Sequence, residues 1–349
     1  MVKIPIIICG FGNVGRAFGS LLAQKALLLK EQYDLEVNVR AVVDIRGAAV
    51  AGDAPIPMEK LVEFCSNGGQ VQDFAILGRP GLTSEQVADM VPASVWVEIT
   101  PTNINHGEPG LGNIRTALYH GLHVITANKG PLVLRFKELM EIANARNVRI
   151  FYSAATAAAL PTLDVGIVCL AGTHLISAEG ILNGTSNYIL TRMQEDDVPY
   201  AEALSEAQKL GIAEPDPSYD VEGWDTANKL VLIANGLFGA GVSLNDVTVQ
   251  GIREITPVDI QKARENGKVI RLIGKIQRDE EQVIVRVAPL ALDRNHPMAS
   301  VSGSEKGITY STDIMDRVTV TGGKSSPLGA AAAMMKDLIN LAAQRRECS

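Results

Sequence analysis

The stretch from residue 211 to residue 229 holds the side chains of this chain that are best suited to acid–base chemistry. Five carboxylates precede one lysine there, and Asp225 and Lys229 are four residues apart at the start of an expected helix. Residues at that spacing share one face of a helix, a single turn apart. A lysine held near a carboxylate can bind a substrate oxygen and move a proton while a carbonyl and an alcohol interconvert.

Two further acids of this stretch could bind substrate. Glu214 and Asp220 lie on a proline-constrained loop and could hold a substrate ammonium group by charge-assisted hydrogen bonds. The alternative is a solvated acidic loop that caps a helix, with Asp225 as the N-cap residue, because surface ion pairs four residues apart are common and weak. The spacing of the acids does not match the calcium loop of an EF-hand. The residues alone leave substrate binding and helix capping both open.

A glycine-rich turn near the N-terminus predicts a nucleotide site. The sequence GFGNVG at residues 10–15 follows an apolar run at residues 4–9 and precedes a helical pattern at residues 16–29. In that context the first glycine permits a tight turn, the second lets the backbone approach a pyrophosphate, and the third lets strand and helix pack closely. The N–H groups at the helix start would face the phosphates. A scaffold of the same shape without a nucleotide is the alternative. The residues expected to bind the cofactor here are Gly10, Gly12, Asn13, Val14 and Gly15.

The second expected strand, residues 37–43, should end at the residue that contacts the adenosine ribose. Asp44 stands there, and a carboxylate suits the 2′-hydroxyl of NAD. Its separation from Gly15 exceeds the usual spacing, which a longer first helix would explain. Arg46 could instead neutralise the 2′-phosphate of NADP, or simply point to solvent. We therefore favour NAD and leave NADP open.

The sequence AEPDPSYDVEGWDTANKL at residues 213–230 resembles the signature of the homoserine dehydrogenase family, in which a Glu/Asp-Pro segment leads to a Gly-x-Asp-x-x-x-Lys helix. Together with the glycine turn, three more segments agree with that family in order along the chain. The resemblance covers most of residues 4–235, and its motifs are specific in combination. The three segments are EITPTN at 98–103, TANKGPL at 126–132 and ILNGTSNYIL at 181–190.

The resemblance implies hydride transfer between C4 of a nicotinamide and the carbon that L-homoserine shares with L-aspartate 4-semialdehyde, in the biosynthesis of threonine and methionine. Lys229 would be the acid/base at the substrate oxygen, and Asp225 would orient it. Glu214, with Asp220 near it, would bind the substrate amino group. Lys129 would lie between nicotinamide and substrate.

Four more residues take roles from the resemblance. Thr100 and Asn103 would contact the nicotinamide end of the cofactor, while Gly184 and Thr185 would bind the substrate near its carboxylate. Each has a plainer alternative: Thr100 and Asn103 could only shape a loop, and Thr185 could only form a turn. Lys129, too, could be no more than a charge at the approach to a helix.

Three departures from the family pattern bear on these implications. The family usually opens a hinge, Ala-x-Val-Gly-x-Gly-x-Pro, with a glutamate, and the carbonyls of that turn can hold a monovalent cation. Here residues 153–161 read SAATAAALP, without the glutamate and both glycines, so we expect no metal. Ile212 replaces a common tyrosine. Lys324, with the two serines that follow it, replaces part of a Gly-Pro-Gly-Ala-Gly segment and could face the ligands or begin the last helix.

The elements that must position these residues predict an α/β fold. Short apolar strands alternate with helices as far as residue 151, which favours a parallel sheet with helices on both faces. We expect a Rossmann-type parallel sheet domain at residues 1–152, completed by a C-terminal helix at 322–349. An inserted α+β catalytic and dimerisation domain should span 153–321. Its sheet should expose an apolar face that pairs with a second subunit, which predicts a homodimer.

Composition narrows the class of protein. The net charge of −7 disfavours nucleic acid and anionic membranes as partners. Four cysteines lack metal-ligand spacing, and no apolar run reaches the ~18 residues of a membrane span, so we expect a cytoplasmic protein. The length suggests a short form without an appended amino-acid-sensing domain. The competing interpretations are another NAD(P)-dependent dehydrogenase of amino or keto acids, and a non-catalytic dinucleotide-binding regulator.

Overall fold

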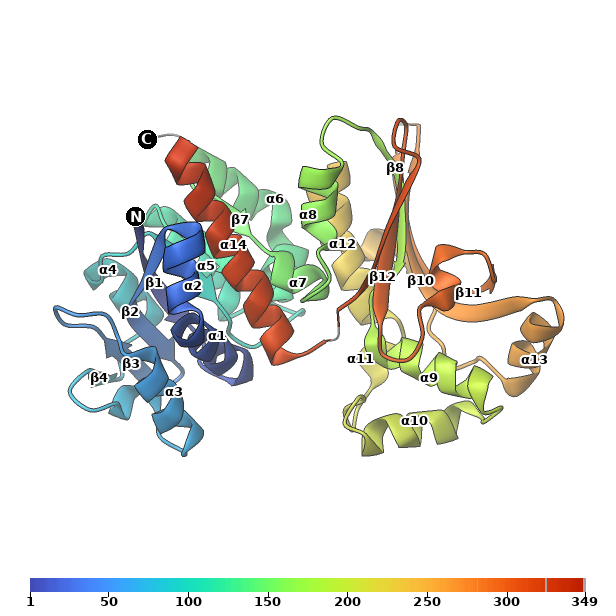
Figure 1. Cartoon of the computed structure of the whole chain (residues 1–349), viewed down its shortest axis with the longest axis horizontal. Coiled ribbons are helices and arrows are strands. Elements are labelled where there is room, and N and C mark those ends of the chain that lie inside the picture. Colours follow the sequence, from blue (N-terminus) through green and yellow to red (C-terminus); the bar gives the residue numbers. More distant parts are fainter. Residues whose placement is uncertain (281, 324, 348–349) are drawn as a thin grey trace. The chain divides into compact units, whose positions relative to one another are not determined.

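The computed structural model describes residues 1–280, 282–323 and 325–347, so Lys324 and Cys348 lie outside the described residues. The chain forms two compact units (Figure 1). Unit 1 contains Met1–Ala158 and the chain from Ser326 onward, and unit 2 contains Ala159–Ser325. Unit 2 is therefore inserted into the sequence of unit 1.

Unit 1 is built on a seven-stranded sheet in the order β4-β3-β2-β1-β5-β6-β7. The five strands from β2 to β7 in that order run parallel, and β3 and β4 add an antiparallel edge. The parallel strands are apolar along most of their length because helices cover both faces. The α/β fold class is confirmed. The strands are β1 Val2–Cys9, β2 Leu35–Asp44, β3 Gly47–Val50, β4 Gly78–Pro80, β5 Val95–Glu98, β6 His123–Thr126 and β7 Ile150–Phe151.

The helices of unit 1 depart from the sequence prediction at one place. The single helix expected at residues 16–29 is two helices that meet at Lys25, which accounts for the long separation of Gly15 and Asp44. The helices are α1 Asn13–Gln24, α2 Ala26–Tyr33, α3 Met58–Ser66, η1 Val71–Asp73, α4 Ser84–Met90, α5 Gly110–Tyr119, α6 Lys129–Ala145, α7 Ser153–Ala157 and α14 Pro327–Glu347.

Helix α14 returns to unit 1 and packs against α1 and α7. Met334 and Leu338 of α14 join the main apolar core of the unit. Residues 153–158, which we assigned to the inserted domain, belong to unit 1. The reason is that Ser153 donates two hydrogen bonds to Asp337 of α14.

Unit 2 is built on a six-stranded sheet in the order β13-β12-β8-β10-β11-β9. Its pairs are antiparallel apart from the parallel pair of β9 and β11. Helix α12, residues Trp224–Phe238, packs on one face of this sheet and is buried nearly all round, as a core helix is. The strands are β8 Leu175–Ile181, β9 Val247–Val249, β10 Lys268–Asp279, β11 Gln282–Asp293, β12 Lys306–Thr312 and β13 Arg317–Gly322. The other helices are α8 Thr162–Asp164, η2 Val165–Cys169, α9 Gly184–Glu195, α10 Tyr200–Lys209, α11 Ser218–Val221, η3 Leu244–Asp246, α13 Pro257–Glu265 and η4 Pro297–Ser300.

The outer face of this sheet is not the exposed apolar face that we expected. Gly274 faces α12, because a Cβ on it would lie 2.8 Å from the side chain of Leu230, so its neighbours Ile273 and Lys275 point outward. Ile273 packs under apolar residues of the η4 segment. Glu179, on the same outer face, pairs with His296 at 2.9 Å. This face is therefore partly covered and carries charged residues, although Ile284, which pairs with Gln277 on the same face, is exposed.

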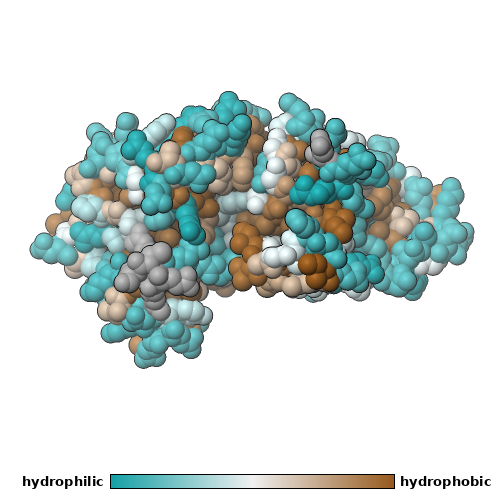
Figure 2. All heavy atoms as spheres, turned by 90° about the horizontal axis from the view of Figure 1, so that it is seen from above, coloured by the Kyte–Doolittle hydropathy of each residue, from teal (hydrophilic) through white to brown (hydrophobic). Residues whose placement is uncertain are grey.

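On the face drawn in Figure 2, polar residues cover much of the area and hydrophobic residues show at several places among them. Across residues 1–280, 282–323 and 325–347, no helix combines the length and the apolar character that crossing a membrane requires.

Candidate active site

The glycine turn closes the carboxyl end of β1 in unit 1. Gly10 has a φ of 96°, and a Cβ on it would lie 2.6 Å from the carbonyl carbon of Ile99. A Cβ on Gly15 would lie 2.4 Å from the carbonyl oxygen of Gly10. Real Cβ atoms do not approach so closely, so both positions require glycine. Gly12 differs, because a Cβ on it would meet no atom within 4 Å.

Open space therefore lies in front of Gly12, beside the start of α1. The N–H of Arg16 donates to the carbonyl of Gly12 at 2.9 Å, which is the first hydrogen bond of the helix. The N–H groups of Asn13, Val14 and Gly15 precede that bond and have no partner within the helix. Such a helix start offers N–H donors and a positive dipole end to an anion. These residues fit a dinucleotide pyrophosphate.

Asp44 and Arg46 lie at the carboxyl end of β2, beside the glycine turn. The N–H of Gly10 donates to the carbonyl of Val43 at 2.8 Å, which fixes this neighbourhood. Asp44 is half-buried and accepts a 2.9 Å hydrogen bond from the N–H of Ile45. Arg46 is exposed in the tight turn from β2 to β3. The carboxylate position at the strand end suits a ribose hydroxyl.

Thr100, Asn103 and Lys129 lie together where β5 and β6 end. Asn128 links them: its Oδ1 accepts from the N–H of Gly130 at 3.2 Å, and its Nδ2 donates to Thr100 Oγ1 at 3.2 Å. Lys129 is the first residue of α6 and is half-buried. A Cβ on Gly130 would lie 2.3 Å from the carbonyl oxygen of Asn103. The loops after the two strands are therefore in direct contact.

Glu98 is a buried acid at this edge to which the sequence analysis assigned no role. Its side chain is fully buried, and Oε2 accepts a 3.1 Å hydrogen bond from Nε1 of Trp96. Oε1 accepts from the N–H of Thr100 at 3.0 Å and from its hydroxyl. Burial raises the pKa of the Glu98 carboxyl, while these hydrogen bonds lower it. In the sequence, Glu98 could have been noticed as a charged residue at the end of an apolar strand. In the structure, its hydrogen bonds fix the position of Thr100.

Lys229 and Asp225 form a buried ion pair in unit 2. Nζ of Lys229 lies 2.6 Å from Oδ2 of Asp225, and their side chains are 10% and 7% exposed. Nζ also donates to the carbonyl of Leu182 at 2.6 Å. The N-cap of α12 is Gly223, with a φ of 89°, so Asp225 lies in the first turn and is not the cap. The alternative of a solvated pair that only caps the helix is wrong.

Asn183 joins this pair to a second acid. Its Nδ2 donates to Asp220 Oδ1 at 2.7 Å and to Asp225 Oδ2 at 2.9 Å. Its Oδ1 accepts from the N–H of Ser186 at 2.9 Å and so caps α9. Burial and the charge of Asp225 raise the pKa of the Asp220 carboxyl. The sequence analysis missed Asn183, although it stands in the ILNGTSNYIL segment.

The other residues expected to bind substrate occupy two settings. Gly184 and Thr185 begin α9 directly after Asn183, and a Cβ on Gly184 would lie 2.8 Å from the carbonyl oxygen of Ser304. Thr185 donates from Oγ1 to the carbonyl of Ile212 at 3.0 Å. Glu214 is exposed, and within the described part of the chain its side chain forms no hydrogen bond or ion pair. The network thus includes Asp220, Asp225 and Lys229 but not Glu214.

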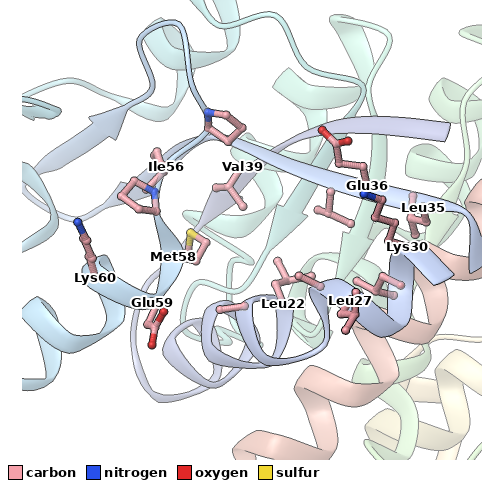
Figure 3. A pocket seen from close by; sticks show the side chains of 16 residues that line it. Leu22, Leu27, Lys30, Leu35, Glu36, Val39, Ile56, Met58, Glu59 and Lys60 are labelled. Atoms are coloured by element: carbon pink, nitrogen blue, oxygen red, sulfur yellow. The ribbon is translucent and has the colours of Figure 1, made fainter. Parts of the chain in front are cut away.

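One pocket lies apart from these residues. A pocket of about 560 Å³ lies between α1, α2, β2 and the start of α3, where apolar side chains converge (Figure 3). From β2 the pocket is lined by Leu35, Glu36, Val37 and Val39, which are distant along the strand from Asp44. Among the residues that the structure describes, no group of three or more His, Cys, Asp or Glu could hold a metal ion.

Comparisons with known proteins identify chains that are similar to this one over nearly its whole length. A family model described as homoserine dehydrogenase matches residues 161–339. The chain is 38% identical over 97% of its length to a homoserine dehydrogenase of Methanocaldococcus jannaschii, of which it covers 98%. It is 34% identical over 98% of its length to an NAD(+)-dependent homoserine dehydrogenase of Pseudomonas canavaninivorans, of which it covers 97%. A crystal structure of a candidate homoserine dehydrogenase from Archaeoglobus fulgidus superimposes with a TM-score of 0.86 at 36% identity, covering 97% of this chain and 99% of that one.

Proposed function

Because this chain belongs to the homoserine dehydrogenase family, we propose that Lys229 is the group that moves the proton in its reaction. The protein is an NAD(P)-dependent oxidoreductase that interconverts L-homoserine and L-aspartate 4-semialdehyde. The nicotinamide supplies or accepts the hydride at the substrate carbon. The observation that carries our proposal is the buried Lys229 amine, fixed by Asp225 and by the carbonyl of Leu182.

In this mechanism the substrate oxygen approaches Nζ of Lys229. The amine takes the proton of the alcohol when homoserine is oxidised, and returns it to the aldehyde oxygen in reduction. The hydrogen bond to Asp225 fixes the orientation of the amine before substrate binds. The entropy cost of ordering the lysine side chain is therefore not part of the activation barrier. Asn183 fixes Asp225 in turn through its side-chain amide.

Substrate binding uses the residues around this network. Asp220 and Glu214 would take the ammonium group of the amino acid through charge-assisted hydrogen bonds. The N-terminus of α9, at Gly184 and Thr185, would take the carboxylate, since a helix start stabilises an anion. The support is their position next to Asn183, which already contacts Asp220 and Asp225.

Cofactor binding uses unit 1. The backbone at Gly12 and the first turn of α1 would bind the pyrophosphate, and Asp44 the ribose. Thr100, Asn103 and Lys129 would contact the nicotinamide end. The carboxylate at Asp44 and the relative named as NAD(+)-dependent both support a preference for NAD over NADP.

We also propose that the enzyme is a cytoplasmic homodimer. The free thiols of Cys9, Cys65 and Cys169 are typical of a reducing compartment. Exposed apolar side chains in unit 2, among them Ile167, Val168 and Ile314, suit a subunit contact. Light scattering on the purified protein tests the dimer, and a monomer mass at all concentrations would refute it.

The experiment that tests the proposed function is the oxidation of L-homoserine followed by nicotinamide absorbance, with NAD and NADP side by side and with other hydroxy and amino acids as controls. We expect turnover with L-homoserine alone and a higher kcat/KM with NAD. Equal turnover with another substrate would favour the alternative dehydrogenase. Cofactor binding without any turnover would favour the regulator.

A further inference from the structure

Glu98 ends strand β5 and holds Thr100 at the edge of the sheet where the cofactor residues of unit 1 lie. Oε1 of Glu98 accepts the N–H of Thr100 at 3.0 Å and also accepts its hydroxyl. Oε2 accepts from Nε1 of Trp96 at 3.1 Å. Glu98 and Trp96 are fully buried, whereas Thr100 is half-buried. A buried carboxyl therefore orients a side chain that is partly open to the surroundings.

The direction of the Thr100 hydroxyl follows from its partner. A backbone N–H can only donate, so Oε1 of Glu98 is an acceptor, and the hydroxyl that meets the same oxygen gives it its one hydrogen. Even a protonated carboxyl would carry its hydrogen on Oε2, because Oε1 faces the amide hydrogen of Thr100. The hydroxyl hydrogen of Thr100 is thus committed to Glu98.

Asn128 indicates the same direction from the other side. Its Oδ1 accepts from the N–H of Gly130 at 3.2 Å, and its Nδ2 donates to Thr100 Oγ1 at 3.2 Å and to the carbonyl of Pro101 at 3.4 Å. An amide turned over would set its NH₂ against the Gly130 N–H and its oxygen against the Pro101 carbonyl. Because the NH₂ group can only donate, Thr100 Oγ1 is an acceptor here. A hydroxyl oxygen has two lone pairs, and Asn128 uses one.

Thr100 lies beside the glycine turn, on the side of the sheet away from Asp44. A Cβ on Gly10 would lie 2.7 Å from the backbone nitrogen of Thr100. Strand β1 lies between β2 and β5, and a dinucleotide crosses such a sheet where the strand order reverses. With the adenosine at Asp44, at the end of β2, the nicotinamide would extend over the ends of β5 and β6.

We propose that Glu98 is a positioning residue that sets Thr100 as a hydrogen-bond acceptor for the carboxamide NH₂ of the nicotinamide. The second lone pair of Thr100 Oγ1 would take that donor, and it would disfavour a ring substituent that only accepts. The inference rests on the proposed function, since it requires a nicotinamide cofactor at this edge. It deepens that function by naming the group of the cofactor that is recognised.

The test measures the affinity of the full chain for three dinucleotides that differ only at this group, by calorimetric titration. NAD carries the carboxamide, its 3-acetylpyridine analogue has a methyl group in place of the NH₂, and deamido-NAD carries a carboxylate. We expect wild type to bind the acetylpyridine analogue about 5-fold or more weakly than NAD, because the donor is missing.

Two substitutions at Thr100 test the hydroxyl itself. Thr100→Val removes it, so the affinities for NAD and the acetylpyridine analogue should become nearly equal, while the affinity for deamido-NAD rises relative to NAD. Thr100→Ser keeps the hydroxyl and should keep the wild-type order. Thr248→Val, at an exposed threonine of β9, is the control and should match wild type in all three titrations.

Glu98→Gln tests the positioning role with Thr100 still present. Its amide NH₂ can donate to Thr100 Oγ1 and release the hydroxyl hydrogen toward the ligand, so we expect the preference for NAD over the acetylpyridine analogue to fall several-fold. If Glu98→Gln folds poorly, the deamido-NAD titration of Thr100→Val still decides the direction of the hydroxyl. A lower affinity for deamido-NAD in that variant would show that the hydroxyl donates to the ligand.

That result would overturn the inference. So would a preference for NAD over the acetylpyridine analogue that survives Thr100→Val, or a folded Glu98→Gln protein with the wild-type ratio of affinities. The proposed function fails in a different way. A protein that discriminates as expected but does not oxidise L-homoserine would refute the proposed reaction alone, and a protein that turns over with unchanged ratios in these variants would refute this inference alone.

Discussion

Asp225 in unit 2 and Asp337 in unit 1 are both buried, and each has a lysine beside it in its own helix. In α12 the lysine is one turn away and nearly as buried as its partner, with Nζ 2.6 Å from the carboxylate. In α14 the lysine is the adjacent residue, its side chain is 33% exposed, and the distance is 3.0 Å. Each lysine also donates a second hydrogen bond. Lys229 donates it to a backbone carbonyl, and Lys336 donates it to a serine hydroxyl.

The difference shows how one pair of residue types can serve chemistry or architecture. The Lys229 amine donates a hydrogen bond to the carbonyl of Leu182, which directly follows β8, and its side chain is largely buried. Such a setting suits proton transfer to a bound substrate. The Lys336 amine balances a charge and completes a link between two segments of one unit. Predictions that separate turnover from stability therefore test the contrast directly.

The largest expected effect is on turnover at the first pair. Lys229→Ala should lower kcat by about 10²-fold or more, since it removes the proposed acid/base, and should leave cofactor affinity nearly unchanged. Steady-state kinetics with a titration of the reduced cofactor measure both. Lys209→Ala, at an exposed lysine of α10, is the control. A kcat within a few-fold of wild type would remove Lys229 from the mechanism.

Asp225→Asn should have a smaller effect on the same reaction. The amide oxygen can still accept a hydrogen bond from Lys229, but the carboxylate charge is lost, so we expect a fall in kcat of roughly 10-fold. The matching substitution in the other pair, Asp337→Asn, should change kcat far less. If the two variants lower kcat equally, the contrast between the pairs fails.

Asp337→Asn should act on stability. The two carboxylate oxygens accept one hydrogen bond each from the N–H and the hydroxyl of Ser153. The amide has only one oxygen, so one of these two donors would face the amide NH₂ and lose its acceptor. The free energy of unfolding should fall by about 1–3 kcal/mol, as measured by urea denaturation. Asp53→Asn, at an exposed aspartate, should be neutral. An unchanged urea midpoint would show that the hydrogen bonds between Ser153 and Asp337 add no stability.

The smallest expected effect concerns Asp220, a second acid near Asp225. Its pKa is raised by burial and by the charge of Asp225. A carboxyl with a higher pKa in the folded chain binds more protons when folded, so its contribution to stability falls as the pH rises from about 4 through the folded pKa. Asp220→Asn cannot titrate, so its melting temperature relative to wild type should rise over that window. A flat or falling difference would contradict the assignment.

Local signals account for what the sequence predicted well. The glycine turn predicted both the strand and the helix around it. The spacing of the three glycines is specific because each one meets a different steric requirement of the turn. Gly10 and Gly15 prove too crowded for a Cβ, and Gly12 borders open space. The pairing of Asp225 with Lys229 follows in the same way from helical spacing.

Contacts between distant segments account for what was missed. Ser153 and Asp337 are 184 residues apart, and no pattern near either one indicates the other. Asn183 has an evident role as a helix cap, and only the fold brings its amide to Asp220 and Asp225. The break of the first helix at Lys25 was missed because the apolar pattern continues across it.

The position of α14 sets the order in which the protein can form. Met334, Leu338 and Leu341 of this helix are part of the core of unit 1, against α1. During synthesis they emerge only after all of unit 2, so the sheet and helices of unit 1 have apolar surface uncovered while the inserted unit is made. Such a wait exposes the chain to aggregation. Chaperone demand in the cell should therefore depend on the final helix as well as on the sheet that it covers.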